Sequence, residues 1–208
     1  FGEIYGPKLL GTILVGGIFG IVFLILKLRN LKFAFFYTFV LFAILPADFF
    51  IRMTYIRAPV LSLFLLVLSI YFLLKKKPVW LAITVFFYVW AYYLMSFTIL
   101  ILIVGYLIIE VLQENKIDFK LIFWPLGGLI AGLIINPFFP DNLPFLLLLL
   151  KASTNERSYA GMELFPPQTW LWFYSSLMVI FLFAGGLLFS LIKGIKQTWQ
   201  TIVLIIIT

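Results

Sequence analysis

Long apolar runs alternate with short charged segments along this chain. A helix needs about 20 mostly apolar residues to cross a bilayer, and many of the runs approach that length. They lie at residues 9–26, 33–47, 59–74, 78–95, 97–113, 120–136 and 171–192, and an eighth begins near residue 198. The pattern therefore predicts an all-α fold, a polytopic membrane helix bundle with about seven complete transmembrane helices and a truncated eighth.

Composition supports this prediction and excludes several kinds of chemistry. Hydrophobic residues make up 64% of the chain and charged residues 11%, which does not suit a soluble core with a wetted surface. Cysteine and histidine are both absent, so disulfides, thiol nucleophiles and imidazole bases are excluded within this sequence. The lysines and arginines lie at the ends of apolar runs rather than in one basic patch, which argues against nucleic acid as a partner.

The two ends of the chain suggest an incomplete protein. The sequence begins with Phe1 rather than Met, and it finishes within an apolar run of 11 residues, 198–208. We expect residues 1–208 to form a single transmembrane domain that is part of a longer chain.

The charges predict an orientation in the membrane, because cytoplasmic connections retain Lys and Arg. If Phe1 lies outside, ten cations and three acids fall inside, while five cations and five acids fall outside. The inner cations are Lys27, Arg29, Lys32, Lys75, Lys76, Lys77, Lys116, Lys120, Lys193 and Lys196. This alternation requires a turn near Ser96 between the runs 78–95 and 97–113. The sequence leaves open whether the runs 78–95 and 97–113 both cross the membrane fully.

The longest connection, residues 137–170, then lies on the outer side. Long loops that mix polar and aromatic residues often carry function. Within this loop, LPFLLLLLK is too short to cross a bilayer, and we expect a short interfacial helix there, with Lys151 reaching toward water.

Small residues four positions apart predict where helices approach closely. Such pairs are Gly16 with Gly20, Gly127 with Ala131, and Gly128 with Gly132. In lipid, small side chains at this spacing allow two helix backbones to come together. Packing is the expected role of these residues.

Two arginines stand out in the stretch DFFIRMTYIRAP, at the outer boundary of the membrane. In a helix, Asp48 and Arg52 share one face with Tyr55, so Asp48 and Arg52 can form a structural ion pair. Alternatively, the arginines bind an anionic phosphate, which matches the guanidinium group well. With one acid for two arginines, Arg57 is the cation left for a phosphate.

Several segments together resemble membrane glycosyltransferases of the GT-C superfold, similar to bacterial dolichyl-phosphate-mannose-type and oligosaccharyltransferase-like proteins. These segments are GPKLL, the RAP that follows the outer arginines, the KKK loop, YVWAYYLMS and LIINPFFPDN. The resemblance implies transfer from a polyprenyl-phosphate-linked sugar donor, with inversion, on the extracytoplasmic face of a prokaryotic cytoplasmic membrane. Arg57 and Arg52 would then bind the donor phosphate, supported by Asp48 and Tyr55.

The resemblance also indicates what this chain lacks. The catalytic acid of the family belongs to the first outer loop, which would lie upstream of Phe1, so the catalytic residue is unknown here. On the acceptor side, Glu163 is a candidate for contact with the acceptor or with a divalent cation. Asn136 and Asp141 either cap helix ends or contact the acceptor.

Two other classes of protein share these features. A secondary transporter or lipid flippase also has many spans and glycine packing, but it places ionisable residues near the middle of the membrane. Here the charges lie toward the ends of the runs. A noncatalytic membrane scaffold is the third possibility, and the sequence does not name the sugar, the acceptor or the oligomeric state.

Overall fold

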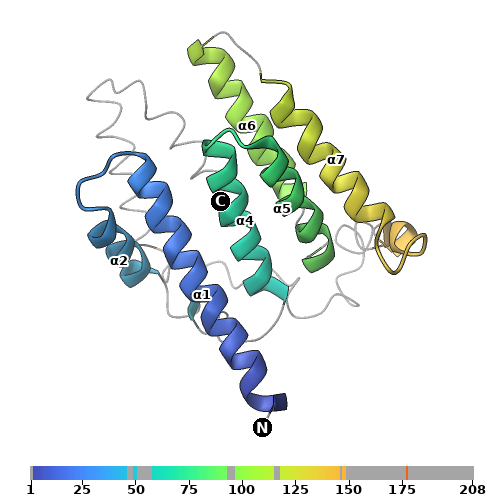
Figure 1. Ribbon diagram of the computed structural model, residues 1–208, viewed down its shortest axis with the longest axis horizontal. Helices are drawn as coiled ribbons and strands as arrows, with labels where there is room; N and C mark the ends of the chain where they lie inside the picture. The colour runs from blue at the N-terminus through green and yellow to red at the C-terminus, as the bar shows by residue number, and fades with distance from the viewer. Residues whose placement is uncertain are drawn as a thin grey trace.

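The computed structural model describes residues 2–45, 49–50, 58–92, 97–114, 118–145, 147–148 and 177. In order along the chain, the helices are α1 (Gly2–Leu28), α2 (Ala34–Ile44), α4 (Ala58–Leu74), α5 (Pro78–Ala91), α6 (Phe97–Glu114) and α7 (Lys120–Ile134). All regular structure in these described ranges is helical, which confirms the all-α prediction for this part of the chain. Figure 1 shows the helices arranged side by side as a bundle.

The turns between helices follow from residues that end one helix and begin the next. Lys76 adopts a left-handed conformation with φ 51°, and its amide donates to the carbonyl of Leu73. The amide of Lys77 donates to the carbonyl of Phe72, which completes a Schellman cap on α4. Pro78 then occupies the first turn of α5, where its missing N–H costs nothing. The KKK segment is therefore a tight turn between two antiparallel helices.

Helices α5 and α7 run in the same direction and pack very closely. A β-carbon placed on Gly128 would lie 2.9 Å from the carbonyl carbon of Ala82, and one on Gly132 would lie 3.0 Å from the carbonyl oxygen of Phe86. Because both sequence numbers increase together along the contact, the two helices are parallel. Helix α6, which follows α5 and precedes α7 in the chain, must then run in the opposite direction to both. Residues 78–114 therefore contain two separate helices, as the alternation of charges predicts.

Buried side chains of α4, α5, α6 and α7 form one apolar core. It includes the almost fully buried Leu73, Leu81, Val85, Ile99 and Leu121. A polar contact crosses this core near one end, where the hydroxyl of Tyr88 is hydrogen-bonded to the side chains of Ser62 and Thr98. This contact joins the start of α4, the end of α5 and the start of α6.

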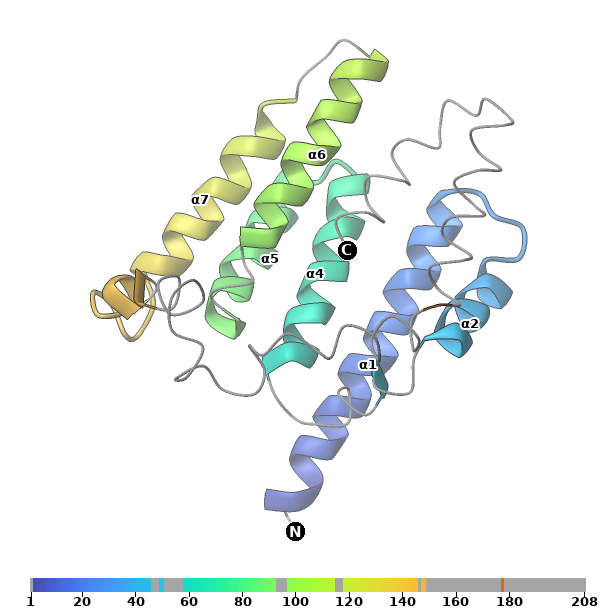
Figure 2. The ribbon, with the colours of Figure 1, turned by 180° about the vertical axis from the view of Figure 1, so that it is seen from behind.

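The bundle consequently has two distinct ends, visible in Figures 1 and 2. The end of α1, the turn between α4 and α5, the end of α6 and the start of α7 lie at one end. We call this the basic end, because its described residues include Lys27, Arg29, Lys32, Lys75, Lys76, Lys77 and Lys120. We call the other the turn end, because the turn that follows α7 lies there, together with the start of α4 and the end of α5.

One helix meets the length and composition of a membrane span. Residues 8–28 of α1 form a 21-residue segment that contains an 18-residue stretch with a mean hydropathy of 2.7, and 11% of that stretch is buried in the protein. The other apolar helices among the described residues have 10–17 residues in their apolar parts. By length and composition, α1 is the one helix among the described residues that could cross a membrane, so the polytopic bundle of about seven transmembrane helices stays a prediction.

The predicted small-residue pairs have different outcomes. Gly128 and Gly132 lie at the close α5–α7 contact, as expected. For Gly16, Gly20 and Gly127 the prediction of close packing is wrong within the described part, since no atom there lies within 4 Å of an added β-carbon. Gly17 contacts α4 instead, where a β-carbon would lie 2.7 Å from Cε2 of Phe64. Spacing alone does not show which face of a helix meets a neighbour.

Candidate functional site

Most of the predicted donor and acceptor residues lie outside the described residues. These are Asp48, Arg52, Tyr55, Arg57 and Glu163. In the chain, the described residues Phe49 and Phe50 follow Asp48, and Ala58, the first residue of α4, follows Arg57. Arg57 immediately precedes α4, and α4 begins at the turn end of the bundle (Figure 1).

Asn136 and Asp141 lie at this same end, in the turn that follows α7 (Figure 1). The side-chain oxygen of Asn136 accepts a hydrogen bond of 3.0 Å from the amide of Phe138, and its backbone carbonyl accepts one of 2.9 Å from Phe139. This is a local Asx-type turn. Asn136 thus reverses the chain after α7, and its side-chain oxygen is already engaged.

Asp141 stands at the start of the next helical turn. Its backbone carbonyl accepts a hydrogen bond of 3.2 Å from the amide of Phe145, and a helical turn covers residues 142–145. The Asp141 side chain is exposed. Asp141 is therefore available at the surface of the turn end.

Asn142 is a polar residue of this turn that the sequence did not single out. It is 6% exposed, and its amide nitrogen donates to the carbonyl of Leu133 at 2.8 Å. Its side-chain oxygen has no hydrogen-bond partner in the described structure. The hydrogen bond ties the turn to the last turn of α7, whose carbonyls lack helical partners.

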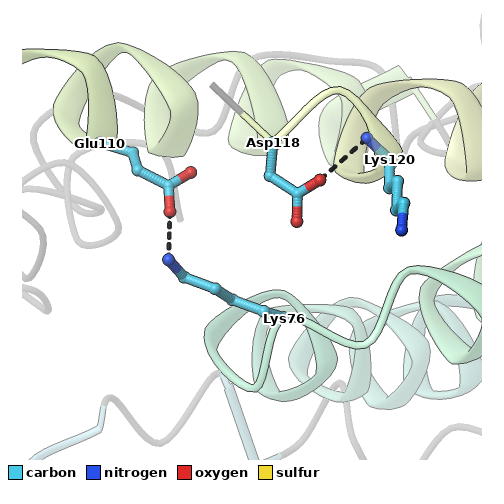
Figure 3. A network of polar contacts seen from close by, with 4 residues as sticks. All are labelled: Lys76, Glu110, Asp118 and Lys120. Carbon is cyan, nitrogen blue, oxygen red and sulfur yellow. Dashed lines mark hydrogen bonds and ion pairs between the residues drawn. The ribbon is translucent and has the colours of Figure 1, made fainter. Parts of the chain in front are cut away.

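The basic end contains a buried ion pair that the sequence did not reveal either. Figure 3 shows the ammonium group of Lys76 pointing at Oε1 of Glu110, with which it forms an ion pair. Glu110 is 3% exposed, and its Oε2 has no hydrogen-bond partner in the described structure. The only sequence signal for this pair is an acid inside an apolar helical run. The pair ties the α4–α5 turn to α6.

Two further charged residues lie beside this pair (Figure 3). Oδ1 of Asp118 accepts a hydrogen bond of 3.1 Å from the backbone amide of Lys120. That amide belongs to the first residue of α7, so the carboxylate satisfies one of the free N–H groups at the start of the helix. Asp118 and Glu110 thus have structural partners in separate contacts.

An apolar groove of about 580 Å³ lies between α5 and α7. Its lining includes Phe86, Phe87, Phe123, Trp124 and Gly127. Close by, the indole N–H of Trp90 donates to the carbonyl of Gly132 at 3.1 Å, which fixes the ends of the two helices together. The lining of the groove is apolar and aromatic.

No group of three or more metal-ligating side chains occurs among the described residues. Comparisons with protein-family models, with curated proteins and with solved structures found no match for this chain. The geometry of the two ends of the bundle therefore carries the functional argument.

Proposed function

We propose that this chain is part of a polytopic membrane glycosyltransferase that takes its sugar from a polyprenyl-phosphate-linked donor on the extracytoplasmic side. In this proposal the basic end faces the cytoplasm and the turn end faces the opposite side. Arg57 binds the donor phosphate, Arg52 assists, and Asp48 and Tyr55 support them. Glu163 and Asp141 belong to the acceptor side.

The observation that carries the proposal is the separation of charged connections between the two ends of the helix bundle. Lys27, Lys32, the lysine turn at 75–77 and Lys120 gather at the basic end, as Figures 1 and 2 allow the reader to follow. Cytoplasmic connections of membrane proteins retain such cations. Helix α4 begins at the turn end, at the residue that follows Arg57 in the sequence. The turn end is then the outer end, and the glycosyltransferases that this sequence resembles transfer sugar on that side of the membrane.

The sides of the helices support a membrane location. In α2 alone, Phe35, Phe36, Phe39 and Leu41 are all exposed large apolar side chains. Soluble proteins rarely expose contiguous apolar surfaces of this kind, whereas lipid solvates them. The Tyr88 contact lies toward the turn end and the Lys76–Glu110 ion pair lies at the basic end. The groove between α5 and α7 is apolar.

The choice of Arg57 rests on charge and position. An arginine at a membrane boundary is costly unless an anion meets it, and Asp48 can compensate one of the two arginines. Phosphate accepts two parallel hydrogen bonds from a guanidinium group, whereas the ammonium of a lysine offers a point charge. The second arginine therefore supplies the phosphate contact.

The test is donor binding and sugar transfer by the full-length protein with Arg57→Ala and Arg57→Lys. A charge-assisted hydrogen bond contributes about 1.5–3 kcal/mol, so Arg57→Ala should weaken donor binding by about tenfold or more. Arg57→Lys should recover part of that loss. If Arg52→Ala abolishes transfer while both Arg57 variants match the parent, the two arginines have exchanged roles. If none of the three changes transfer, the donor-phosphate site is not here.

A transporter gives a different result in the same experiment. Its ionisable residues lie near the middle of the membrane, whereas Glu110, buried in α6, lies four residues before the last residue of that helix. Movement of a polyprenyl lipid across the bilayer without formation of a glycosidic bond would replace the proposed activity with that of a flippase.

A further inference from the structure

The basic end contains a hollow lined by cations, at the opposite end of the bundle from the start of α4. A hollow of about 390 Å³ lies at the corner where α1 leads into α2. Its lining includes Lys27 and Lys32 together with the rings of Phe23, Phe33, Phe35 and Phe36. Two cations beside four aromatic rings combine a charged rim with an apolar wall.

The two lysines have no acid to neutralise them in the part of the chain that the structure describes. Lys27 lies in the last turn of α1, Lys32 lies in the following connection, and both are exposed. The ion pair between described residues at this end is that of Lys76 with Glu110, on other helices. The charge of the hollow is therefore positive and uncompensated within the described residues.

The start of α2 adds to this positive potential. The N-cap residue is Phe33, no side chain caps the helix, and its first turn contains no acid. Phe35 and Phe36 in that first turn line the hollow. The amide of Ala34 donates to the carbonyl of Leu31, and the following N–H groups of the first turn carry a partial positive charge that favours an anion.

The apolar part of the hollow decides what kind of anion fits. Phe33, Phe35 and Phe36 are all strongly exposed, with 67%, 69% and 61% of their surface accessible. A free phosphate ion would leave these rings in water, whereas the acyl chains of a lipid would cover them. Basic pockets between helices on the cytoplasmic side are suited to the head groups of anionic lipids.

We propose that the corner between α1 and α2 binds an anionic membrane phospholipid. Its phosphate lies between Lys27 and Lys32 at the start of α2, and its acyl chains lie over Phe33, Phe35 and Phe36. This inference rests on the membrane location in the proposed function and not on sugar transfer. The site holds the α1–α2 corner at the inner membrane surface, at the end opposite the donor site.

The experiment uses the full-length protein in detergent and two double variants that remove the same charge at the same end. One is Lys27→Gln with Lys32→Gln, and the other, the matched control, is Lys75→Gln with Lys77→Gln. Added dioleoylphosphatidylglycerol should raise the unfolding temperature of the parent and of the control, and native mass spectrometry should show the lipid retained. The Lys27/Lys32 variant should bind this lipid at least tenfold more weakly. Zwitterionic dioleoylphosphatidylcholine should have little effect on any of them.

Several outcomes would overturn the proposal. Equal loss in both double variants would indicate a diffuse basic surface, and equal stabilisation by inorganic phosphate would indicate a site for a free anion. If the variant with Lys27→Gln and Lys32→Gln does not fold, the variant with Lys27→Arg and Lys32→Arg replaces it in the test. This variant keeps both positive charges, so it should retain lipid binding, and loss of binding would contradict the proposal. Arg57→Ala should leave phosphatidylglycerol binding unchanged, so failure at the donor site and failure at this site are separable.

Discussion

At the scale of single residues, the Glu110 carboxylate has the most demanding surroundings. It is 3% exposed and pairs with Lys76, whose own side chain is 45% exposed. The two partners therefore differ in what they lose if the pair is broken. Lys76 can return to water, whereas Glu110 would stay buried with an uncompensated charge.

This difference predicts unequal effects of the two neutral replacements. Lys76→Gln should lower the free energy of unfolding by about 1–3 kcal/mol, because a buried charged group loses its partner. Glu110→Gln should cost less, since the lysine that remains is half-exposed. The double variant should be more stable than the sum of the single effects implies, and reversible denaturation of all three variants in detergent measures this coupling.

Lys77→Gln, one residue further on, is the control, and its effect should stay within about 0.5 kcal/mol. A coupling energy near zero between Lys76 and Glu110 would contradict the structural role assigned to the pair.

The two asparagines of the turn after α7 permit a matched comparison. Asn136 uses its side-chain oxygen as an acceptor, whereas Asn142 uses its amide nitrogen as a donor to Leu133. Asn136→Asp keeps the acceptor and should change stability little. Asn142→Asp loses the donor and brings a carboxylate oxygen toward a carbonyl, so it should destabilise the protein by about 1–3 kcal/mol. Thermal unfolding of both variants at neutral pH tests the contrast, and equal effects would refute it.

At the scale of helices, the parallel contact between α5 and α7 is the closest in the described structure. Gly128 has no room for a side chain, because an added β-carbon would meet the backbone of Ala82. Backbone atoms cannot move aside as the end of a flexible side chain can. The two helices would have to separate, and the hydrogen bond from Trp90 to Gly132 would be lost with them.

Gly128→Ala should therefore destabilise the bundle by about 1–3 kcal/mol, the usual cost of overpacking, or by more. Gly127→Ala is the matched control, since it makes the same change one residue earlier on an open face of the same helix. It should be neutral or stabilise the helix by up to about 1 kcal/mol, because alanine is the better helix former. Unfolding curves for the two variants in the same detergent make the measurement. Equal loss in both would show that the α5–α7 contact is not close at Gly128.

At the scale of the whole molecule, the connections alternate between two ends that differ in charge. The Tyr88 contact with Ser62 and Thr98 gathers three helix ends at the turn end, and the Lys76–Glu110 pair gathers a turn and a helix at the basic end. In the proposed orientation these ends lie on opposite sides of a membrane.

Single cysteines test this orientation directly, because the chain has none of its own. Asp141→Cys, at the exposed turn end, should react with a membrane-impermeant maleimide in intact cells. Lys77→Cys, at the basic end, should react only after the membrane is permeabilised. The reverse pattern would invert the topology and remove the basis of the proposed function. Reaction of both positions in intact cells would argue against a membrane crossing between the two ends.

The helices themselves are largely predictable from the sequence, because they depend on local properties of the chain. The predicted runs 33–47, 59–74, 97–113 and 120–136 correspond to α2, α4, α6 and α7, with ends that differ by a few residues. The run 9–26 lies within α1, which begins earlier, at Gly2, and the run 78–95 extends beyond α5, which ends at Ala91. The runs after residue 148 and the donor residues at 48–57 lie outside the described residues, so those predictions stay open.

What the sequence by itself determined is the helical character of the described chain and the alternation of its connections. Both follow from the length of apolar runs and from the cations between them, and neither requires knowledge of distant contacts. Only the tertiary structure decided which partners meet. It selected Gly128 rather than Gly127 for close packing, and it joined Lys76 to Glu110 and Asn142 to Leu133. The physical reason is that a helix's apolar sequence is compatible with many neighbours and rotations, whereas backbone clearance and the pairing of buried polar groups are satisfied only in particular arrangements.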